Sequence, residues 1–147
     1  MHTHSPTVPE AGTTPFHQLL QAAAAEAQPQ RLLFVFTAAE LPPDATPAQR
    51  ARFERGQGGH LTPLMCVDKT LEELDSFATL ADEAGAYGPP WQVVFVGALG
   101  GSRGQPPSDA QVNSALERMV EAVKRGDVDG FLAYGAQGEA LTLALGT

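Results

Sequence analysis

Three runs of apolar residues stand out along the chain, at positions 32–36, 61–67 and 91–99. Each run is nearly continuous, without the apolar–polar alternation of a strand that has one face in water. Such runs are typical of parallel strands that helices cover on both faces. The second run is predicted to be the buried central strand, because Gly58 and Gly59 precede it and the helix-capping residue Thr70 follows it.

Between these runs, apolar residues recur at the spacing of helices that bury one face. Each such segment opens on a capping residue, and these are Thr14, Thr46, Thr70 and Ser108. The four predicted helices extend to about residues 28, 55, 84 and 125, where a proline or a glycine follows. Two further apolar segments, 131–134 and 140–145, flank a glycine-containing loop and predict a C-terminal hairpin.

The predicted order of elements is therefore α-β-α-β-α-β-α-β-β. Alternation of strands with helices is typical of crossover units, in which neighbouring strands run parallel. We expect an α/β fold with a single-layer, mainly parallel sheet of about five strands flanked by helices, and the hairpin should add an antiparallel edge strand. Residues 14–147 should form one domain. Residues 1–13 are polar and contain prolines, which predicts a disordered tail.

Composition and charge narrow the functional classes. Nine Lys and Arg face 17 Asp and Glu, and the formal net charge of -8 repels nucleic-acid phosphates and anionic lipid. We therefore expect neither nucleic acid nor a membrane as partner. No apolar stretch approaches the roughly 18 residues of a membrane span, and the N-terminus lacks a signal-peptide pattern, so we expect a cytoplasmic protein. The single cysteine, Cys66, permits no internal disulfide, in keeping with a reducing compartment.

The sequence contains no motif for a cofactor or a metal. The four histidines, at positions 2, 4, 17 and 60, fall in different segments, and no paired Cys/His spacing occurs. Neither a Walker loop nor a Gly-x-Gly-x-x-Gly turn is found, and no serine lies in a Gly-x-Ser-x-Gly turn. We therefore expect no cofactor and no bound metal, and we assign no catalytic set.

The best candidate site lies where ligands bind to a parallel sheet, beyond the carboxyl ends of the strands. The loops expected there bring together Glu40, Asp44, Cys66, Asp68, Lys69, Ser102 and Arg103. Cys66 is a candidate nucleophile or redox thiol, with Lys69 and the next helix start as sources of positive charge. Asp68 is a candidate general base or metal ligand. The competing interpretation is structural: a small residue buried at a strand end, and a carboxylate that hydrogen-bonds locally before a helix.

The glycine-rich loop formed by Gly100, Gly101, Ser102, Arg103 and Gly104 is a second candidate. Its backbone amides could surround a phosphate group. Two prolines separate this loop from the next helix, which weakens the contribution of the helix start to anion binding. The competing interpretation is a mobile surface loop.

Three segments carry a resemblance to a known family: Arg-Leu-Leu-Phe-Val-Phe at 31–36, Gly-Gly-x-Leu-x-Pro-Leu-Met-Cys-Val-Asp-Lys at 58–69, and Trp-Gln-Val-Val-Phe-Val at 91–96. Over about residues 16–143, the chain resembles small uncharacterised bacterial proteins, some of which carry the label ribonucleotide reductase subunit alpha. That reaction needs a reducible cysteine pair and a radical cysteine, in a subunit several times longer. A chain with Cys66 alone cannot perform it. The glycine-led strand before a helix is also similar to SseB-type domains, which have no catalytic motif.

We expect a non-catalytic domain that acts through protein–protein interaction, with a partner or with itself. The positive reason is the terminal apolar strand from Ala140 to Leu145, which contains no lysine or proline to blunt its edge. This edge could pair with a second copy to form a homodimer. The alternative is a small-ligand or phosphate-binding protein, or a thiol-dependent enzyme, that uses the loop edge around Cys66, Asp68, Lys69 and Arg103.

Overall fold

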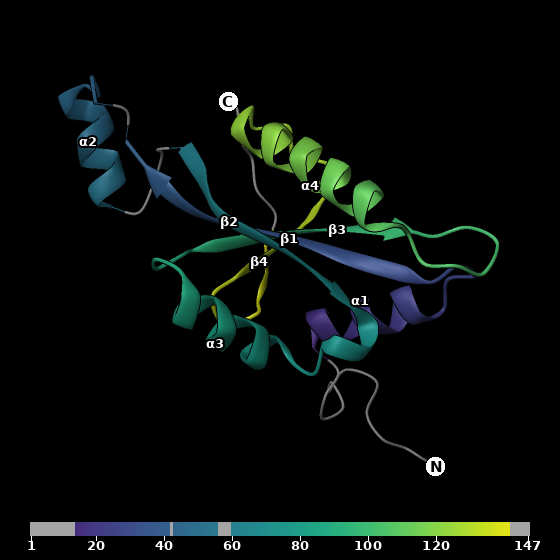
Figure 1. Cartoon of the computed structure of the whole chain (residues 1–147). Coiled ribbons are helices and arrows are strands. Elements are labelled where there is room, and N and C mark those ends of the chain that lie inside the picture. The colour runs from purple at the N-terminus through teal and green to yellow at the C-terminus, as the bar shows by residue number, and fades with distance from the viewer. Residues whose placement is uncertain (1–13, 42, 56–59, 142–147) are drawn as a thin grey trace, which may run out of the picture.

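The structure, a computed structural model, describes residues 14–41, 43–55 and 60–141 (Figure 1). The helices are α1 (Pro15–Ala24), α2 (Pro47–Glu54), the 3-10 helix η1 (Leu71–Glu73), α3 (Phe77–Tyr87) and α4 (Asp109–Lys124). The strands are β1 (Gln30–Glu40), β2 (His60–Thr70), β3 (Val93–Gly100), β4 (Leu132–Gly135) and β5 (Ala140–Leu141). The predicted tail, residues 1–13, lies outside the described residues, and so does most of the predicted terminal strand, residues 142–145.

The strands form one sheet in the order β2-β1-β3-β4-β5, and every neighbouring pair is antiparallel. The prediction of a mainly parallel sheet is therefore wrong. Because β2 and β3 both run opposite to β1, they run parallel to each other with β1 between them. The helical connection from β2 to β3 is thus a crossover that skips one strand. The sequence shows a strand, a helix and a strand in either case. It does not show whether the two parallel strands are direct neighbours or have a third strand, here β1, between them.

The prediction of a buried central strand at residues 61–67 is also wrong. β1 occupies that position, paired with β2 on one side and β3 on the other, and its residues from Leu32 to Thr37 are buried. β2 is an edge strand in which no residue is buried. The two apolar runs look alike in sequence. They differ in burial because, in the part of the chain that the structure describes, β1 has two neighbouring strands and β2 has one.

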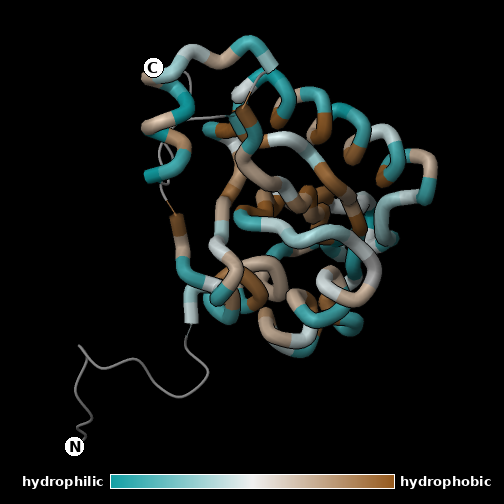
Figure 2. Tube along the Cα trace, turned by 90° about the vertical axis from the view of Figure 1, so that its left-hand side faces the viewer, coloured by the Kyte–Doolittle hydropathy of each residue, from teal (hydrophilic) through white to brown (hydrophobic). Residues whose placement is uncertain are grey.

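Helices cover both faces of the sheet (Figure 1). On one face, α4 packs on Leu33 and Val35 of β1, and Figure 2 shows its hydrophobic positions turned toward the strands. On the other face, residues of α1, η1 and α3 pack around Phe34 and Phe36. Consecutive residues of β1 therefore enter two separate cores. This double cover explains why the apolar run is continuous although the sheet is antiparallel.

Capping residues set where the helices begin. Thr46 and Ser108 form capping boxes that start α2 and α4, as the sequence predicts. Thr70 forms the same box, yet only η1 follows it, and Leu74 returns to extended backbone. Ser76 then caps α3, so the single helix predicted from Thr70 is two elements.

Candidate functional site

The outer side of β2 forms one edge of the sheet, and no strand of the described chain pairs with it. The first half of this edge is irregular, because it contains Pro63 and because its register with β1 shifts between Phe36 and Thr37. Prolines and bulges are devices that protect an edge from pairing with another chain. From Met65 to Thr70 the register is continuous and no proline occurs. These six residues, 65–70, are called the open stretch below.

Side chains of the open stretch alternate between the two faces of the sheet. Met65, Val67 and Lys69 pair with β1 residues on the α3 face. Cys66 and Asp68 pair with β1 residues on the α4 face. A cavity borders the open stretch on each of these faces.

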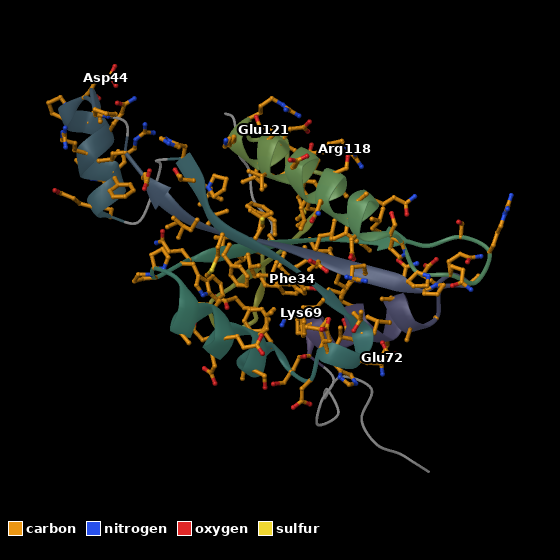
Figure 3. The ribbon with its side chains drawn as sticks, viewed as in Figure 1. Phe34, Asp44, Lys69, Glu72, Arg118 and Glu121 are labelled. Carbon is orange, nitrogen blue, oxygen red and sulfur yellow. The ribbon has the colours of Figure 1, made fainter. Side chains whose placement is uncertain are left out.

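The cavity on the α3 side has a volume of about 340 Å³ and separates β2 from α3. Its apolar walls are Phe36, Met65, Val67, Leu80 and Ala84. Lys69 and Glu83 complete the lining and form an ion pair, with 3.0 Å between Nζ and Oε1. Figure 3 shows Lys69 on this side of the sheet. The space is therefore mainly apolar, and the two charges that border it neutralise each other.

The depression on the α4 side has a volume of about 600 Å³ and lies between β2 and α4. It is lined by Cys66 of β2 and by Asn113, Leu116, Glu117, Val120 and Glu121 of α4. Glu121 pairs with Lys124 at 3.1 Å, and both side chains are more than half exposed. Within the described chain, Glu117 forms no ion pair. This side of the open stretch therefore combines apolar residues with an excess of carboxylate.

The predicted site residues Asp68 and Lys69 are both held in ion pairs. Oδ2 of Asp68 lies 2.5 Å from Nη1 of Arg31 in β1, and both side chains are less than one third exposed. Arg31 was not predicted as a site residue, because in the sequence it is only the polar start of an apolar run. In the register of β1 with β2, Arg31 lies opposite Thr70. Asp68 is two residues before Thr70 on β2, so the side chain of Arg31 can reach it. The ion pair of this carboxylate with Arg31 therefore links β1 to β2.

Cys66 is exposed within the open stretch, so the prediction of a small residue buried at a strand end is wrong. Partial burial, and then the negative charge of Asp68, raise the pKa of its thiol. A raised pKa lowers the fraction of thiolate at neutral pH, and the thiolate is the nucleophile. The electrostatic environment therefore opposes the alternative of a thiol-dependent enzyme.

The glycine-rich loop after β3 is a closed turn. Gly100 is the last residue of β3, and the amides of Gly101, Ser102 and Gly104 each donate to a protein oxygen 2.8 to 3.0 Å away. Arg103 and Gly104 form its tip with φ angles of 54° and 78°, as a two-residue hairpin turn requires. Because these amides have acceptors within the protein, they are not available to surround a phosphate group.

The structure brings only part of the predicted site together. The carboxyl ends of β2 and β3 share one end of the sheet, so Asp68, Lys69 and the glycine-rich loop lie toward the same end. Glu40 ends β1 at the opposite end, roughly 30 Å along the strand from Arg31. Asp44 lies beyond it, beside α2 (Figure 3). The predicted cleft of seven residues does not form, because the carboxyl ends of two antiparallel neighbours lie at opposite ends of the sheet along the strand direction.

A further cavity of about 790 Å³ lies between the starts of α1 and α3 and the turn from β4 to β5. Its lining includes Thr14, Phe16, Phe77 and Gly138. Nowhere in the described chain do three or more His, Cys, Asp or Glu residues gather in a way that could hold a metal ion. None of the helices described is long and apolar enough to span a membrane.

Comparison of the chain with protein-family models, with curated proteins and with solved structures gives no significant match. The two resemblances noted in the sequence therefore stay predictions.

Proposed function

We propose that the protein is a non-catalytic interaction domain that binds an extended segment of a partner protein by strand addition to β2. In this mode of binding, the backbone of the partner pairs with an open sheet edge, and pockets beside that edge receive alternate side chains. One observation carries the proposal. The open stretch combines six regularly paired residues with a cavity on each face of the sheet.

The opposite edge of the sheet offers less support for strand addition. β5 consists of Ala140 and Leu141, and the rest of the predicted strand, to Leu145, lies outside the described residues. Self-association through that strand stays a prediction. β2, in contrast, supplies six regularly paired residues, 65–70, with a cavity on each face of the sheet.

A second copy of the chain is a poorer occupant of β2 than a different partner. Two β2 edges paired about a twofold axis would bring two α4 helices together. Glu117 and Glu121 of each copy would then approach like charges of the other, in chains that each carry a net charge of -8. A partner of different composition avoids this repulsion.

Random peptides of about ten residues, displayed on phage and selected on the full chain, test the proposal. We expect selected peptides to slow hydrogen exchange at the backbone amides of residues 65–70, because an added strand shields the edge. Val67→Lys and Ala84→Leu should each weaken binding at least about tenfold, because they change the α3-side cavity from opposite walls. Circular dichroism establishes that each variant is folded.

Leu132→Lys is the matched control for the binding assay. Leu132 is an apolar residue of β4 that is 50% exposed, so the same chemical change is made away from β2. This variant should bind the selected peptides as the wild type does. The proposal is wrong if selected peptides protect another part of the chain, if Val67→Lys and Ala84→Leu bind them unchanged, or if the selection yields no binder.

A further inference from the structure

We infer that the strand accepted by β2 has a two-faced pattern, with aliphatic side chains toward α3 and basic side chains toward α4. This inference rests on the proposed function and specifies the partner that it requires. The pattern follows from the different surroundings of three consecutive residues of β2. Met65 and Val67 border the apolar cavity on the α3 side, and Cys66 between them borders the carboxylate-rich depression on the α4 side.

The alternation is imposed by strand geometry. Successive side chains of any added strand point to opposite faces of the sheet, and each lies beside a side chain of β2 on the same face. A partner strand next to the open stretch therefore places every second residue under α3 and the others under α4. Figure 3 shows the two environments on opposite sides of the sheet, with Lys69 toward α3 and Glu121 on α4.

The α3 side selects aliphatic residues. Five of the seven residues that line its cavity are apolar, and they come from three elements: β1, β2 and α3. The two charged residues, Lys69 and Glu83, already pair with each other at 3.0 Å. A charged side chain placed here would lose its hydration and meet no unpaired opposite charge, whereas an aliphatic one would leave water for apolar surroundings.

The α4 side selects lysine or arginine. Leu116 and Val120 offer an apolar surface along which the methylene stem of such a side chain can lie. Glu117, on the same helix, offers a carboxylate that no cation of the described chain neutralises. Arg31 and Lys124 are engaged by Asp68 and Glu121, and Arg118 of α4 donates from Nη1 to Oγ of Ser114 at 2.8 Å. An acidic partner residue would add a further negative charge to this surface.

Three synthetic peptides test the pattern by fluorescence anisotropy with the full chain. The first alternates valine and lysine, the second alternates valine and glutamate, and the third has the composition of the first with its lysines and valines in separate blocks. We expect the first peptide to bind at least about tenfold more tightly than either of the others. The block peptide has the same charge, so it separates the pattern from a general attraction to an acidic protein.

Variants that remove carboxylates test whether the preference for lysine over glutamate in the peptide comes from α4. In the double variant Glu117→Gln and Glu121→Gln, the preference for lysine over glutamate should shrink to about threefold or less, while the preference for alternation over blocks remains. Asp129→Asn is the matched control, because Asp129 is an exposed carboxylate in the loop after α4. It should leave both preferences unchanged.

The outcomes of these experiments distinguish a failure of the two-faced pattern from a failure of strand addition. If valine–glutamate peptides bind as tightly as valine–lysine peptides and still protect residues 65–70, the inference is wrong and strand addition stands. The inference is also wrong if the block peptide binds as well as the alternating one, or if Asp129→Asn removes the preference as fully as the double variant does. If phage-selected peptides fail to protect β2, the proposed function fails, and the inference fails with it.

Discussion

β1 and β2 are neighbours of equal length, eleven residues each, and both contain an unbroken apolar run. β1 buries six consecutive residues, whereas β2 buries none. The difference does not come from hydrophobicity, since Leu, Met and Val at positions 64, 65 and 67 are apolar as well. It comes from position: among the described residues, β1 has a strand on each side and β2 has one. An apolar run that would be buried in the centre of a sheet stays partly exposed at its edge.

The same comparison explains why a binding surface can exist beside β2. Both cores follow β1 across the sheet, with α4 on one face and α1, η1 and α3 on the other. At β2 the two cavities lie between the sheet and the helices α3 and α4, and no strand of the described chain pairs with the outer side of β2. Apolar side chains that stay partly exposed beside these cavities are what an added strand could cover.

The largest expected difference between the strands concerns packing. Phe34→Ala in β1 removes a side chain with 0% exposure and should lower the free energy of unfolding by about 3–5 kcal/mol. Val67→Ala in β2 removes a smaller, partly buried side chain and should cost about 1 kcal/mol or less. Urea denaturation followed by circular dichroism measures both. Equal losses would mean that β2 supports the core as strongly as β1 does.

A smaller difference concerns buried polar groups. The hydroxyl of Thr37 in β1 is fully buried and donates to the carbonyl of Val93 at 2.8 Å, so Thr37→Val should cost about 1–3 kcal/mol. The hydroxyl of Thr62 in β2 donates to the exposed carboxylate of Glu40 at 3.0 Å. Thr62→Val should therefore change stability by less than about 0.5 kcal/mol. Thermal unfolding of the two variants compares them, and a costly Thr62→Val would contradict the assignment of β2 as a loosely held edge.

The smallest expected effect is on thiol chemistry. Iodoacetamide should alkylate Cys66 in the native protein, because the residue is exposed. The raised pKa keeps the proton on sulfur to higher pH, so the midpoint of the rate against pH should lie above that of the chain unfolded in urea. Mass spectrometry of the intact protein follows the reaction.

A cysteine in β1 provides the matched control for this measurement. Val35 has 0% exposure, and Val35→Cys combined with Cys66→Ser should react only as fast as the protein unfolds. A native midpoint for Cys66 at or below that of the unfolded chain would show an activated thiol. That result would restore the enzyme alternative.

The sequence anticipated some residues of the candidate site but not their arrangement. Cys66, Asp68 and Lys69 were predicted together, and they do lie on one strand. Glu40 and Asp44 were predicted to join them and lie toward the other end of the sheet, because parallel strands were assumed. The partners of the open stretch on other elements, Arg31, Glu83, Glu117 and Glu121, were not predicted. In the sequence they are ordinary charged residues of strands and helices, and no spacing links them to β2.

The sequence by itself determined the kinds of most elements and where α1, α2 and α4 begin. Capping boxes at Thr46 and Ser108 and the periodic apolar face of α4 are local signals, which act within a few residues along the chain. Only the tertiary structure decided the direction and order of the strands, and with them which apolar run became the core and which became the edge. Strand pairing joins residues far apart in sequence, such as Arg31 and Thr70, and an apolar run does not specify its partner.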